Sequence, residues 1–441
     1  MQLIFSTFNT TRFIRINKKK TRKKQLKMTR YFLCILFVFI LIGCQNNEFE
    51  AVNFSNKNLL SKNRSTDKQE QQNTVVIRFK KGLSDSEKAI IRSNYNVLSF
   101  EVCSCGDPEL ENWFFSDDLT IAELEEKVLS MESDTEMEGA DLNFTITIDT
   151  NGISKQNINT QREISVGTSK RNTTGKIDVV VGVLDSGINP SYFQFTESFL
   201  FDSTSMTDTC GNEIFGWNFV NNDNAPVDDS GHGTRVSYFI YEQLVNSQKS
   251  FQILPAKVFD ANGSSSLFTI NCGFSYLIKR KVNVINMSFG WKNNPSSVMK
   301  SYIDEIEKNI LINASAGNLG ENNDVVPHYP SSYKNKNILA VTAIDNTTPP
   351  NLVLGNVSLS NYGENSVDIG VKGLGIPFYD LSNSSPIFIS GTSYSNAKAC
   401  GFNATLYKMN MPVTEWRHDI IQNSIISPNL NLIKYSAYLE L

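Results

Sequence analysis

Residues 177–187 read Ile-Asp-Val-Val-Val-Gly-Val-Leu-Asp-Ser-Gly. The run is almost continuously apolar and rich in valine, which is typical of a parallel strand buried on both faces. Asp185 follows this strand directly, and open α/β sheets place their functional sites at the carboxyl ends of such strands. The stretch therefore predicts an α/β fold with Asp185 at the edge of the sheet where a site forms.

Two later stretches supply chemical partners for this carboxylate. His232 is one of only three histidines in 441 residues and stands in Asp-Asp-Ser-Gly-His-Gly-Thr, while Ser393 stands in Gly-Thr-Ser. Amphipathic stretches follow at 234–244 and 394–409, so each residue opens a predicted helix. A serine hydroxyl attacks when an imidazole takes its proton, and a carboxylate orients that imidazole. Asp185, His232 and Ser393 are therefore predicted to form a catalytic triad.

Together these motifs resemble the subtilisin-like serine peptidases, the subtilase family or peptidase family S8. The likeness runs over roughly residues 177–425 and includes the segments 256–264, 282–290 and 314–318. It implies a subtilisin-like three-layer α/β fold with a mostly parallel central sheet. It also implies a serine endopeptidase in which the Asn318 side chain and the Ser393 backbone N–H stabilise the oxyanion.

The resemblance also implies which residues contact a protein or peptide substrate. Ser264 is expected to lie along the unprimed side of the substrate. Two further segments are expected to border the P1 side chain, through Ser288, Phe289, Gly290, Ser315, Ala316 and Gly317. Because these segments hold no acidic cluster, we expect an apolar or medium-sized P1 side chain. No cofactor or metal is expected, since residues 245–251 are too few for the calcium loop that many family members insert there.

The sequence departs from the family pattern at both predicted helices. The usual His-Val-Ala-Gly after Thr234 is Arg-Val-Ser-Tyr238 here, and the usual Met-Ala-x-Pro after Ser393 is Tyr-Ser-Asn-Ala397. These changes bear on how tightly the two helices pack and therefore on the rate. They favour a rival hypothesis, a catalytically weak or inactive subtilase-fold surface lipoprotein that acts as a binding module. Retention of all four predicted catalytic residues favours the peptidase, because function must be argued from the site.

The amino terminus carries an export signal. Basic residues at 12–30 precede an apolar run at 31–43 that is shorter than the ~20 residues of a membrane-spanning helix. The run ends Leu-Ile-Gly-Cys44, which resembles a bacterial lipobox and implies that Cys44 is lipidated. Residues 1–44 are then a basic leader, with a second candidate start at Met28, and a lipoprotein signal peptide. We expect an exported lipoprotein anchored to a membrane of the bacterial cell envelope, with an uncleaved anchor as the alternative.

A polar tether and a separate small domain follow. Residues 45–73 are polar and have little to bury. Residues 74–149 contain two capping boxes, Ser84-Asp-Ser-Glu87 and Thr120-Ile-Ala-Glu123, which open helices. These helices alternate with predicted strands at 75–79, 97–102, 110–115 and 142–148. The order β-α-β-β-α-β predicts a small ferredoxin-like α+β unit.

A unit of this kind directly before a subtilase domain resembles the family's propeptide. The resemblance implies a self-inhibited precursor, a zymogen, in which the peptidase domain at 177–441 has its own propeptide as a partner. The polar linker at 150–176 would then be suited to cleavage. The alternative is an accessory domain without an inhibitory role.

Charge and the remaining titratable residues narrow the function further. A net charge of −4 and a pI near 5.6, without a strongly basic folded region, disfavour a nucleic-acid partner. His328 and His418 stand in no nucleophile or metal motif and are expected to be surface or structural residues. Both are therefore left out of the predicted site.

Five cysteines remain beyond the signal peptide and the lipobox, so at least one thiol is unpaired. Cys272 and Cys400 stand on apolar helix faces, which predicts small core residues. Cys103-Ser-Cys105 has no second pair at zinc-site spacing, so its cysteines are predicted to be strand or turn residues.

Overall fold

The computed structural model describes residues 69–148, 176–192, 200–203, 210–354, 360–379 and 385–441. The predicted signal peptide with Cys44, residues 45–68 of the predicted tether and almost all of the predicted linker lie outside the described residues. Within the described ranges, no helix has both the length and the apolar composition that crossing a membrane requires.

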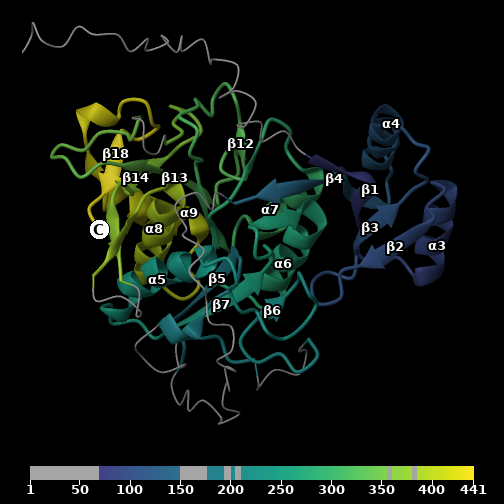
Figure 1. The fold of residues 1–441 in the computed structure, drawn as a ribbon, viewed down its shortest axis with the longest axis horizontal. Helices are drawn as coiled ribbons and strands as arrows, with labels where there is room; N and C mark the ends of the chain where they lie inside the picture. The colour runs from purple at the N-terminus through teal and green to yellow at the C-terminus, as the bar shows by residue number, and fades with distance from the viewer. Residues whose placement is uncertain (1–68, 149–175, 193–199, 204–209, 355–359, 380–384) are drawn as a thin grey trace, which may run out of the picture. The chain divides into compact units, whose positions relative to one another are not determined.

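The larger part of the chain is built on a nine-stranded sheet, in which all neighbouring strands but one pair are parallel (Figure 1). Its strands, in spatial order, are β17 (Ile425–Ile426), β18 (Ala437–Leu439), β14 (Ile369–Lys372), β13 (Ile338–Ile344), β11 (Leu311–Ser315), β9 (Val284–Met287), β5 (Val179–Asp185), β7 (Phe251–Lys257) and β6 (Trp217–Asn218). β5 corresponds to the strand predicted at 177–184 and pairs with β7 on one side and β9 on the other. The mostly parallel sheet is therefore confirmed.

Helices cover both faces of this sheet. Val181 and Val183 of β5 belong to a core cluster with α5 (His232–Val245), α8 (Thr392–Leu406) and α9 (Val413–Gln422). Leu184 belongs to the opposite cluster, with α6 (Leu267–Lys279) and α7 (Ser297–Ile306). Successive side chains of a strand point to opposite faces, so an almost continuous apolar run buries both. This produces the predicted three layers.

The first described residues form the predicted α+β unit, hereafter the N-terminal domain. Its elements are β1 (Gln69–Phe79), α3 (Asp85–Asn94), β2 (Ser99–Val102), β3 (Leu110–Phe114), α4 (Ile121–Glu132) and β4 (Met137–Thr147). The strands lie in the order β2-β3-β1-β4 and are antiparallel, as in a ferredoxin-like unit. Both capping boxes are present, Ser84 with Glu87 and Thr120 with Glu123.

Three details of this domain differ from the sequence predictions. β1 begins at Gln69 and β4 at Met137, several residues before the predicted starts, because Gln69 pairs with Thr145 and Met137 pairs with Phe79. Pairing between distant segments leaves no signal in a polar stretch such as 69–73. The apolar periodicity after Thr120 predicts one buried helix face that includes Ile121 and Leu124, but Ile121 is 54% exposed while Leu124 is buried.

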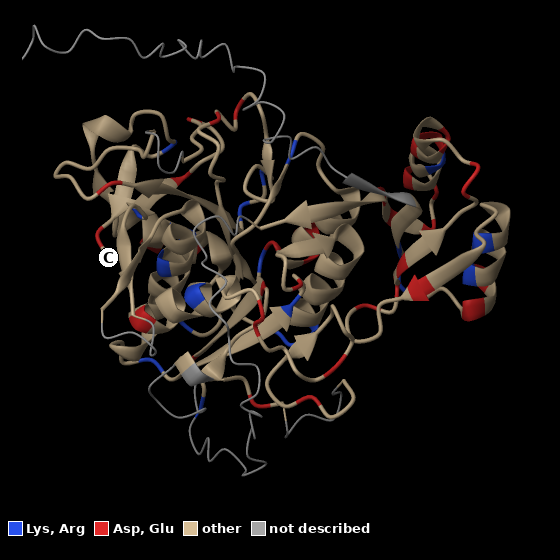
Figure 2. Ribbon diagram, in the orientation of Figure 1, with Lys and Arg blue, Asp and Glu red and all other residues tan. Residues whose placement is uncertain are grey.

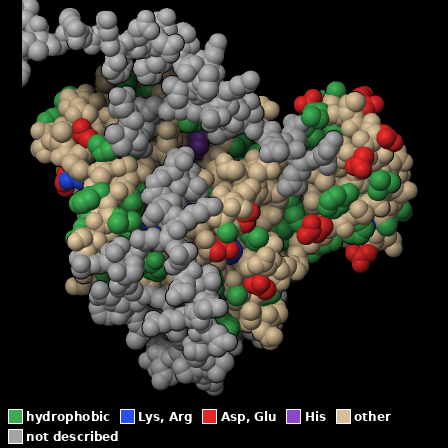
Figure 3. Space-filling view, in the orientation of Figure 1, with side chains coloured by type: hydrophobic (Ala, Val, Ile, Leu, Met, Phe, Trp, Pro, Cys, Tyr) green, Lys and Arg blue, Asp and Glu red, His purple; other side chains and the backbone are tan. Residues whose placement is uncertain are grey.

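The surface of the N-terminal domain mixes acidic and apolar side chains. Figure 2 shows acidic residues gathered along α4, and Figure 3 shows hydrophobic side chains spread over the same domain. Its edge strand β2 exposes Phe100 and Val102, with Glu101 between them. A charged residue on an edge strand disfavours pairing with another chain.

The described ranges also contain shorter elements. They are β8 (Ser264–Ser266), β10 (Trp291–Lys292), β12 (His328–Tyr329), β15 (Ile376–Phe378), β16 (Ile387–Ile389) and two 3-10 turns, η1 (Pro190–Tyr192) and η3 (Pro428–Leu430). β10 pairs with β12, and β15 pairs with β16.

Candidate active site

Asp185 and His232 form a buried pair at the carboxyl edge of the sheet. Asp185 is the last residue of β5 and His232 the first residue of α5. The Nδ1 atom of His232 lies 2.8 Å from Oδ1 of Asp185. Because an ionised carboxylate only accepts hydrogen bonds, Nδ1 donates, and Nε2 of a neutral ring is left as an acceptor. The pair therefore fixes the tautomer that a general base requires.

The pKa of His232 results from opposing effects. Burial alone lowers the pKa, but the negative charge and hydrogen bond of Asp185 raise it, and Asp228 adds to the increase. The net direction is upward from the ordinary value of 6.5. The surroundings of His232 therefore favour its protonated, imidazolium form.

Asp228 ties the loop after β5 to the start of α5, a role that the sequence reasoning missed. Its Oδ1 accepts from the Ser186 hydroxyl and the Gly231 N–H, each at 2.8 Å. Its Oδ2 accepts from the backbone N–H and the hydroxyl of Thr234, at 2.7 and 2.6 Å. Gly231, the N-cap, has no side chain to cap the helix. An aspartate four residues before the histidine was the available signal.

The two segments that carry Asp185 and His232 approach as closely as backbones can. A Cβ atom added to Gly233 would lie 2.2 Å from the carbonyl oxygen of Gly187. The helices α5 and α8 also meet at a glycine, since a Cβ on Gly401 would lie 2.6 Å from the carbonyl oxygen of Ile240. Glycine is the residue that permits such contacts.

The aromatic residues that depart from the family pattern fill the space beside these helices. Tyr238 packs edge-on against Phe378, with ring centroids 5.1 Å apart. Tyr394 is buried, and its ring lies 5.9 Å from that of His232 and 5.8 Å from that of Phe239. The substitutions are therefore accommodated while α5 and α8 still pack closely.

Ser393 is the second residue of α8 and lies next to Tyr394, which contacts the His232 ring. Its hydroxyl donates to the carbonyl oxygen of Ser288 at 3.0 Å, and the Ser288 hydroxyl donates to the Ser393 carbonyl oxygen at 2.9 Å. Between the described residues Ser393 and His232 there is no hydrogen bond. Catalytic hydrogen bonds are often long or poorly aligned before substrate binds.

Asn318 follows β11 and faces the start of α8. Its Oδ1 accepts from the backbone N–H and the hydroxyl of Thr392, both at 2.9 Å. Of the two polar atoms of this amide, only the oxygen can accept from a backbone N–H, so these bonds fix which way the Asn318 amide points. Its Nδ2 has no hydrogen-bond partner among the described residues. A free donor is therefore held beside the residue that precedes Ser393.

A buried asparagine network anchors α8 to the sheet and was also missed by sequence reasoning. The Nδ2 atom of Asn396 lies 3.0 Å from Oδ1 of Asn286 and 3.2 Å from the carbonyl oxygen of Asn313. Nδ2 of Asn403 lies 3.2 Å from Oδ1 of Asn313. These bonds join the helix that carries Ser393 to β9 and β11. The signal was an asparagine inside each apolar strand, which a buried strand keeps only when it is hydrogen-bonded.

This arrangement can be compared with known proteins. Residues 176–430, more than half of the chain, match the family model described as Subtilase family. The chain belongs to the subtilase family.

Individual relatives are similar over part of their length. The chain is 31% identical over 239 residues to the cell wall-associated protease of Bacillus subtilis (strain 168), which covers 53% of this chain and 24% of that protein. It is 28% identical over 200 residues to thermitase of Thermoactinomyces vulgaris, covering 44% of this chain and 67% of thermitase. A solved structure, of a cold adapted subtilisin-like serine proteinase, aligns with a TM-score of 0.47 and 20% identity, covering 60% of this chain and 88% of that one.

Two of the subtilase segments predicted to border P1 meet at His328. A Cβ on Gly290 would lie 2.1 Å from Cε1 of His328, and a Cβ on Gly317 would lie 3.0 Å from its Cδ2. His328 is buried, which lowers its pKa to about 4, with a smaller effect from Lys292, so it is neutral at pH 7. The ring therefore packs against both segments, a place that the sequence did not reveal. His418 is exposed on α9.

The other residues of these segments are largely buried. Ser315 and Ala316 stand at the end of β11, and the Phe289 ring packs against Phe259 with centroids 5.3 Å apart. Within the parts of the chain that the structure describes, no three His, Cys, Asp or Glu side chains are placed to hold a metal ion.

The segment expected to bind the unprimed side of a substrate already pairs with the end of the N-terminal domain. β4 joins β8 as an antiparallel strand, with Ile146 opposite Ser265 and Thr147 opposite Ser264. Beyond this ladder, the N–H of Ile148 donates to the carbonyl oxygen of Gly263 at 2.9 Å. Ile146 and Ile148 are buried, while Thr147 between them is exposed. β8 thereby joins the sheet of the N-terminal domain as its fifth strand, next to β4.

Proposed function

We propose that this protein is a serine endopeptidase in which His232 acts as the general base for Ser393. The observation that carries the proposal is the buried 2.8 Å hydrogen bond between Asp185 and His232, which leaves Nε2 available as a proton acceptor. The relatives described as proteases support the same class of reaction. A binding scaffold has no physical need for an imidazole whose tautomer and charge are both controlled by a buried carboxylate.

The proposed reaction proceeds through an acyl-enzyme. The Ser393 hydroxyl turns from Ser288 toward His232 and attacks the peptide carbonyl carbon while Nε2 takes its proton. The oxyanion accepts from the Asn318 amide and the Ser393 N–H. His232 then returns the proton to the leaving amine, and water repeats the sequence to release the acyl group. Asp185 keeps its negative charge throughout and stabilises the imidazolium.

A serine-directed fluorophosphonate tests this assignment. The processed wild-type protein, treated with a dithiol reductant, should be labelled, and Ser393→Ala treated in the same way should not be. Ser395→Ala is the matched control, because this second serine lies two residues further along the same helix and should leave labelling intact. Equal labelling of wild type and Ser393→Ala would refute the role of Ser393.

The rival function is a binding module, and one observation favours it: the Ser393 hydroxyl donates to the Ser288 carbonyl instead of to His232. In that case the wild-type protein would not react with fluorophosphonate, although it would be folded. The same labelling experiment therefore separates the two functions.

The N-terminal domain is proposed to be an inhibitory propeptide that the peptidase itself removes. Its β4 strand supports this, because Thr145–Thr147 pair with β8 and Ile148 bonds to Gly263, along the segment expected to bind substrate. A further contact supports docking: Asp141 of β4 accepts from the backbone N–H groups of Ser297 and Val298 at the start of α7, each at 2.9 Å. A carboxylate at a helix start is favourable electrostatically.

Self-processing is proposed to fall close to the end of β4. The family resemblance implies a cut near residues 145–156, and the pairing of β4 with β8 favours the part of this range that follows Ile148. Because the strand is held in place, cleavage is intramolecular and its rate should be independent of protein concentration. Terminal sequencing of wild type and Ser393→Ala tests this. If both remain intact, or both are cut alike, the domain is an accessory one.

The enzyme is further proposed to be an exported lipoprotein. The lipobox-like ending at Cys44 supports the anchor, and relatives described as cell wall-associated and extracellular proteases support export. Palmitate labelling should disappear in Cys44→Ser. Persistent labelling of that variant would rule out the lipobox.

A further inference from the structure

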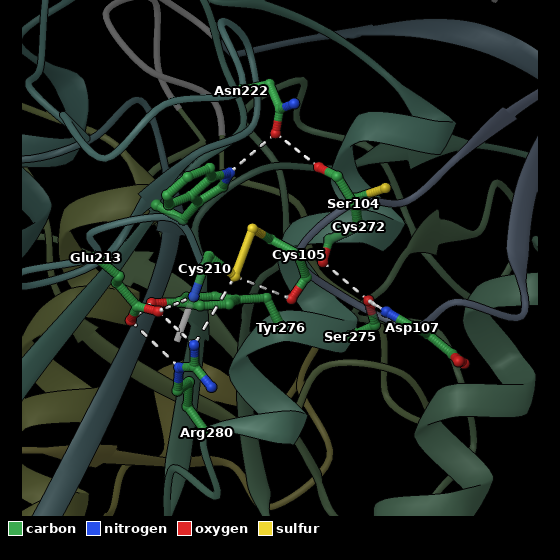
Figure 4. The surroundings of a disulfide bond; sticks show 11 residues. Ser104, Cys105, Asp107, Cys210, Glu213, Asn222, Cys272, Ser275, Tyr276 and Arg280 are labelled. Atoms are coloured by element: carbon green, nitrogen blue, oxygen red, sulfur yellow. Dashed lines mark hydrogen bonds and ion pairs between the residues drawn. A yellow bond between two sulfur atoms is a disulfide. The ribbon is translucent and has the colours of Figure 1, made fainter. Parts of the chain in front are cut away.

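A disulfide joins the N-terminal domain to the peptidase part of the chain. Figure 4 shows the bond between Cys105, in the loop between β2 and β3, and Cys210, which precedes β6. Their Cα atoms are 5.5 Å apart although 105 residues separate them in sequence. The cysteine count alone did not reveal this pairing, because the two residues stand in unrelated segments.

The Cys210 side of the junction is fixed by a buried ion pair. Glu213 accepts from the Cys210 backbone N–H at 3.3 Å, and its own N–H donates to the Cys210 carbonyl at 2.6 Å. Its carboxylate pairs with Arg280 at the end of α6 and accepts from the Tyr276 hydroxyl at 2.5 Å. Both charged side chains are buried. Cys210 is therefore held on α6 independently of the disulfide (Figure 4).

The Cys105 side docks on the same helix. The backbone N–H of Asp107 donates to the Ser275 hydroxyl at 3.0 Å, and the Ser104 hydroxyl donates to Asn222 at 2.6 Å. A Cβ on Gly106 would lie 2.2 Å from the Ser275 oxygen, so the loop lies directly on α6. Both bonded cysteines are buried, 5% and 7% exposed.

Two free thiols lie beside the bond without taking part in it. Cys103 and Cys272 are both buried, and their side chains interact with one another across the same junction. Burial raises the pKa of the Cys272 thiol well above its ordinary value, and Cys103 adds to the increase. Since the thiolate is the attacking form, the Cys272 thiol is a poor nucleophile toward the Cys105–Cys210 bond at neutral pH.

We propose that the Cys105–Cys210 disulfide keeps the cleaved N-terminal domain covalently attached to the peptidase, and that a dithiol reductant releases it. The proposal rests on the proposed self-processing. A cut within 149–175 leaves Cys105 on one fragment and Cys210 on the other. The strand that ends at Ile148 then stays on β8 at the high effective concentration of a linked partner, so inhibition survives dilution.

The release step is a balanced thiol–disulfide exchange. A thiolate of the dithiol attacks one sulfur of the bond, the S–S bond breaks, and the other cysteine leaves as a thiolate that takes up a proton. The second thiol of the reductant then attacks the mixed disulfide, and the remaining protein cysteine leaves as a thiolate that takes up a proton. The protein disulfide gains two electrons, and the dithiol is oxidised to its own disulfide. Disulfides persist outside the cytoplasm, which agrees with the proposed export.

Electrophoresis of the processed protein tests the tether. Wild type should give one band without reductant and two bands with it, whereas Cys105→Ser should give two bands in both conditions. Cys103→Ser is the matched control from the same loop and should behave as wild type. Two bands for unreduced wild type, or for unreduced Cys103→Ser, would overturn the proposal.

Activity gives a second measurement. On dilution by about 1,000-fold, unreduced wild type should keep its specific activity within about twofold, because a linked inhibitor does not dissociate into solution. Cys105→Ser, and wild type treated with a dithiol, should instead become at least about tenfold more active on dilution. An equal rise in untreated wild type and Cys105→Ser would overturn the proposal.

A designed cut separates this proposal from self-processing. A recognition site for a specific protease is inserted within 150–175 of the Ser393→Ala chain, which is then cut by the added protease. If wild type is never processed, the proposed self-processing fails, yet the cut Ser393→Ala fragments still show whether the disulfide holds the two parts together. Fragments that remain together until reduced support it, and fragments that separate without reductant refute it.

Discussion

Gly233→Ala should misplace the candidate catalytic pair without altering any reacting group. Gly233 follows His232, and the oxygen it faces belongs to Gly187, two residues after Asp185. A Cβ would lie 2.2 Å from that oxygen, whereas ordinary van der Waals contact begins at 3.4 Å. Both sides of the contact are backbone, so neither can rotate away. The segments must separate by about 1 Å, and a misplacement of this size can cost about 100-fold in rate.

The assay measures the second-order rate constant for fluorophosphonate labelling of the processed and reduced enzyme. This rate constant depends little on the identity of P1. Gly211→Ala is the control, because its Cβ would meet only Trp217 at 3.8 Å. Thermal unfolding of both variants checks that the fold is retained. A loss of about 100-fold corresponds to about 2.7 kcal/mol of transition-state stabilisation.

Two results would refute this reasoning. If folded Gly233→Ala labels within about threefold of wild type, the contact with Gly187 does not set the geometry of the Asp185–His232 pair. If Gly211→Ala loses as much activity, the effect arises from the glycine-to-alanine change itself and not from the 2.2 Å approach.

Three further predictions concern the chemistry. Asn318→Ala should lower kcat by about 100- to 1,000-fold, with a smaller change in KM. This range for kcat was measured for such a donor in a subtilisin and is carried over to this relative. An unchanged kcat would exclude an oxyanion role for Asn318. Because the pKa of His232 is raised, kcat/KM should increase with pH through a midpoint above 6.5. The folding stability that the protonated imidazole contributes should be lost as the pH increases through the same midpoint. Asp185→Asn removes the charge that does most to raise the pKa of His232, so burial should lower this pKa and move the midpoint of kcat/KM to lower pH. An unchanged midpoint would show that Asp185 is not the cause of the raised pKa. Finally, His328→Gly should raise the ratio of kcat/KM for large aromatic P1 residues to kcat/KM for small ones by at least about tenfold, because the His328 ring packs against Gly290 and Gly317. His418→Ala is the control and should leave this ratio unchanged. An unchanged ratio in His328→Gly would show that the His328 ring does not border the P1 site.

Local patterns were sufficient for the elements and for the family. The valine-rich run before Asp185 predicted a strand buried on both faces, and β5 confirmed it. The capping boxes at Ser84 and Thr120 predicted helix starts, because a cap is an interaction between residues three apart. The amphipathic stretches after His232 and Ser393 predicted that both residues lie at helix starts, and both helices begin there.

Contacts between distant segments could be known only from the tertiary structure. Asp228 joining two loops, Asn396 reaching β9 and β11, and His328 lying between Gly290 and Gly317 each depend on how the sheet brings its carboxyl ends together. The Cys105–Cys210 bond likewise joins two segments that share no motif. Short-range hydrogen bonds and side-chain periodicity depend on neighbouring residues, which the sequence shows directly. Packing and disulfide pairing depend on which surfaces meet, so the sequence can mark a residue such as Asp228 or Asn313 without showing which distant residues it contacts.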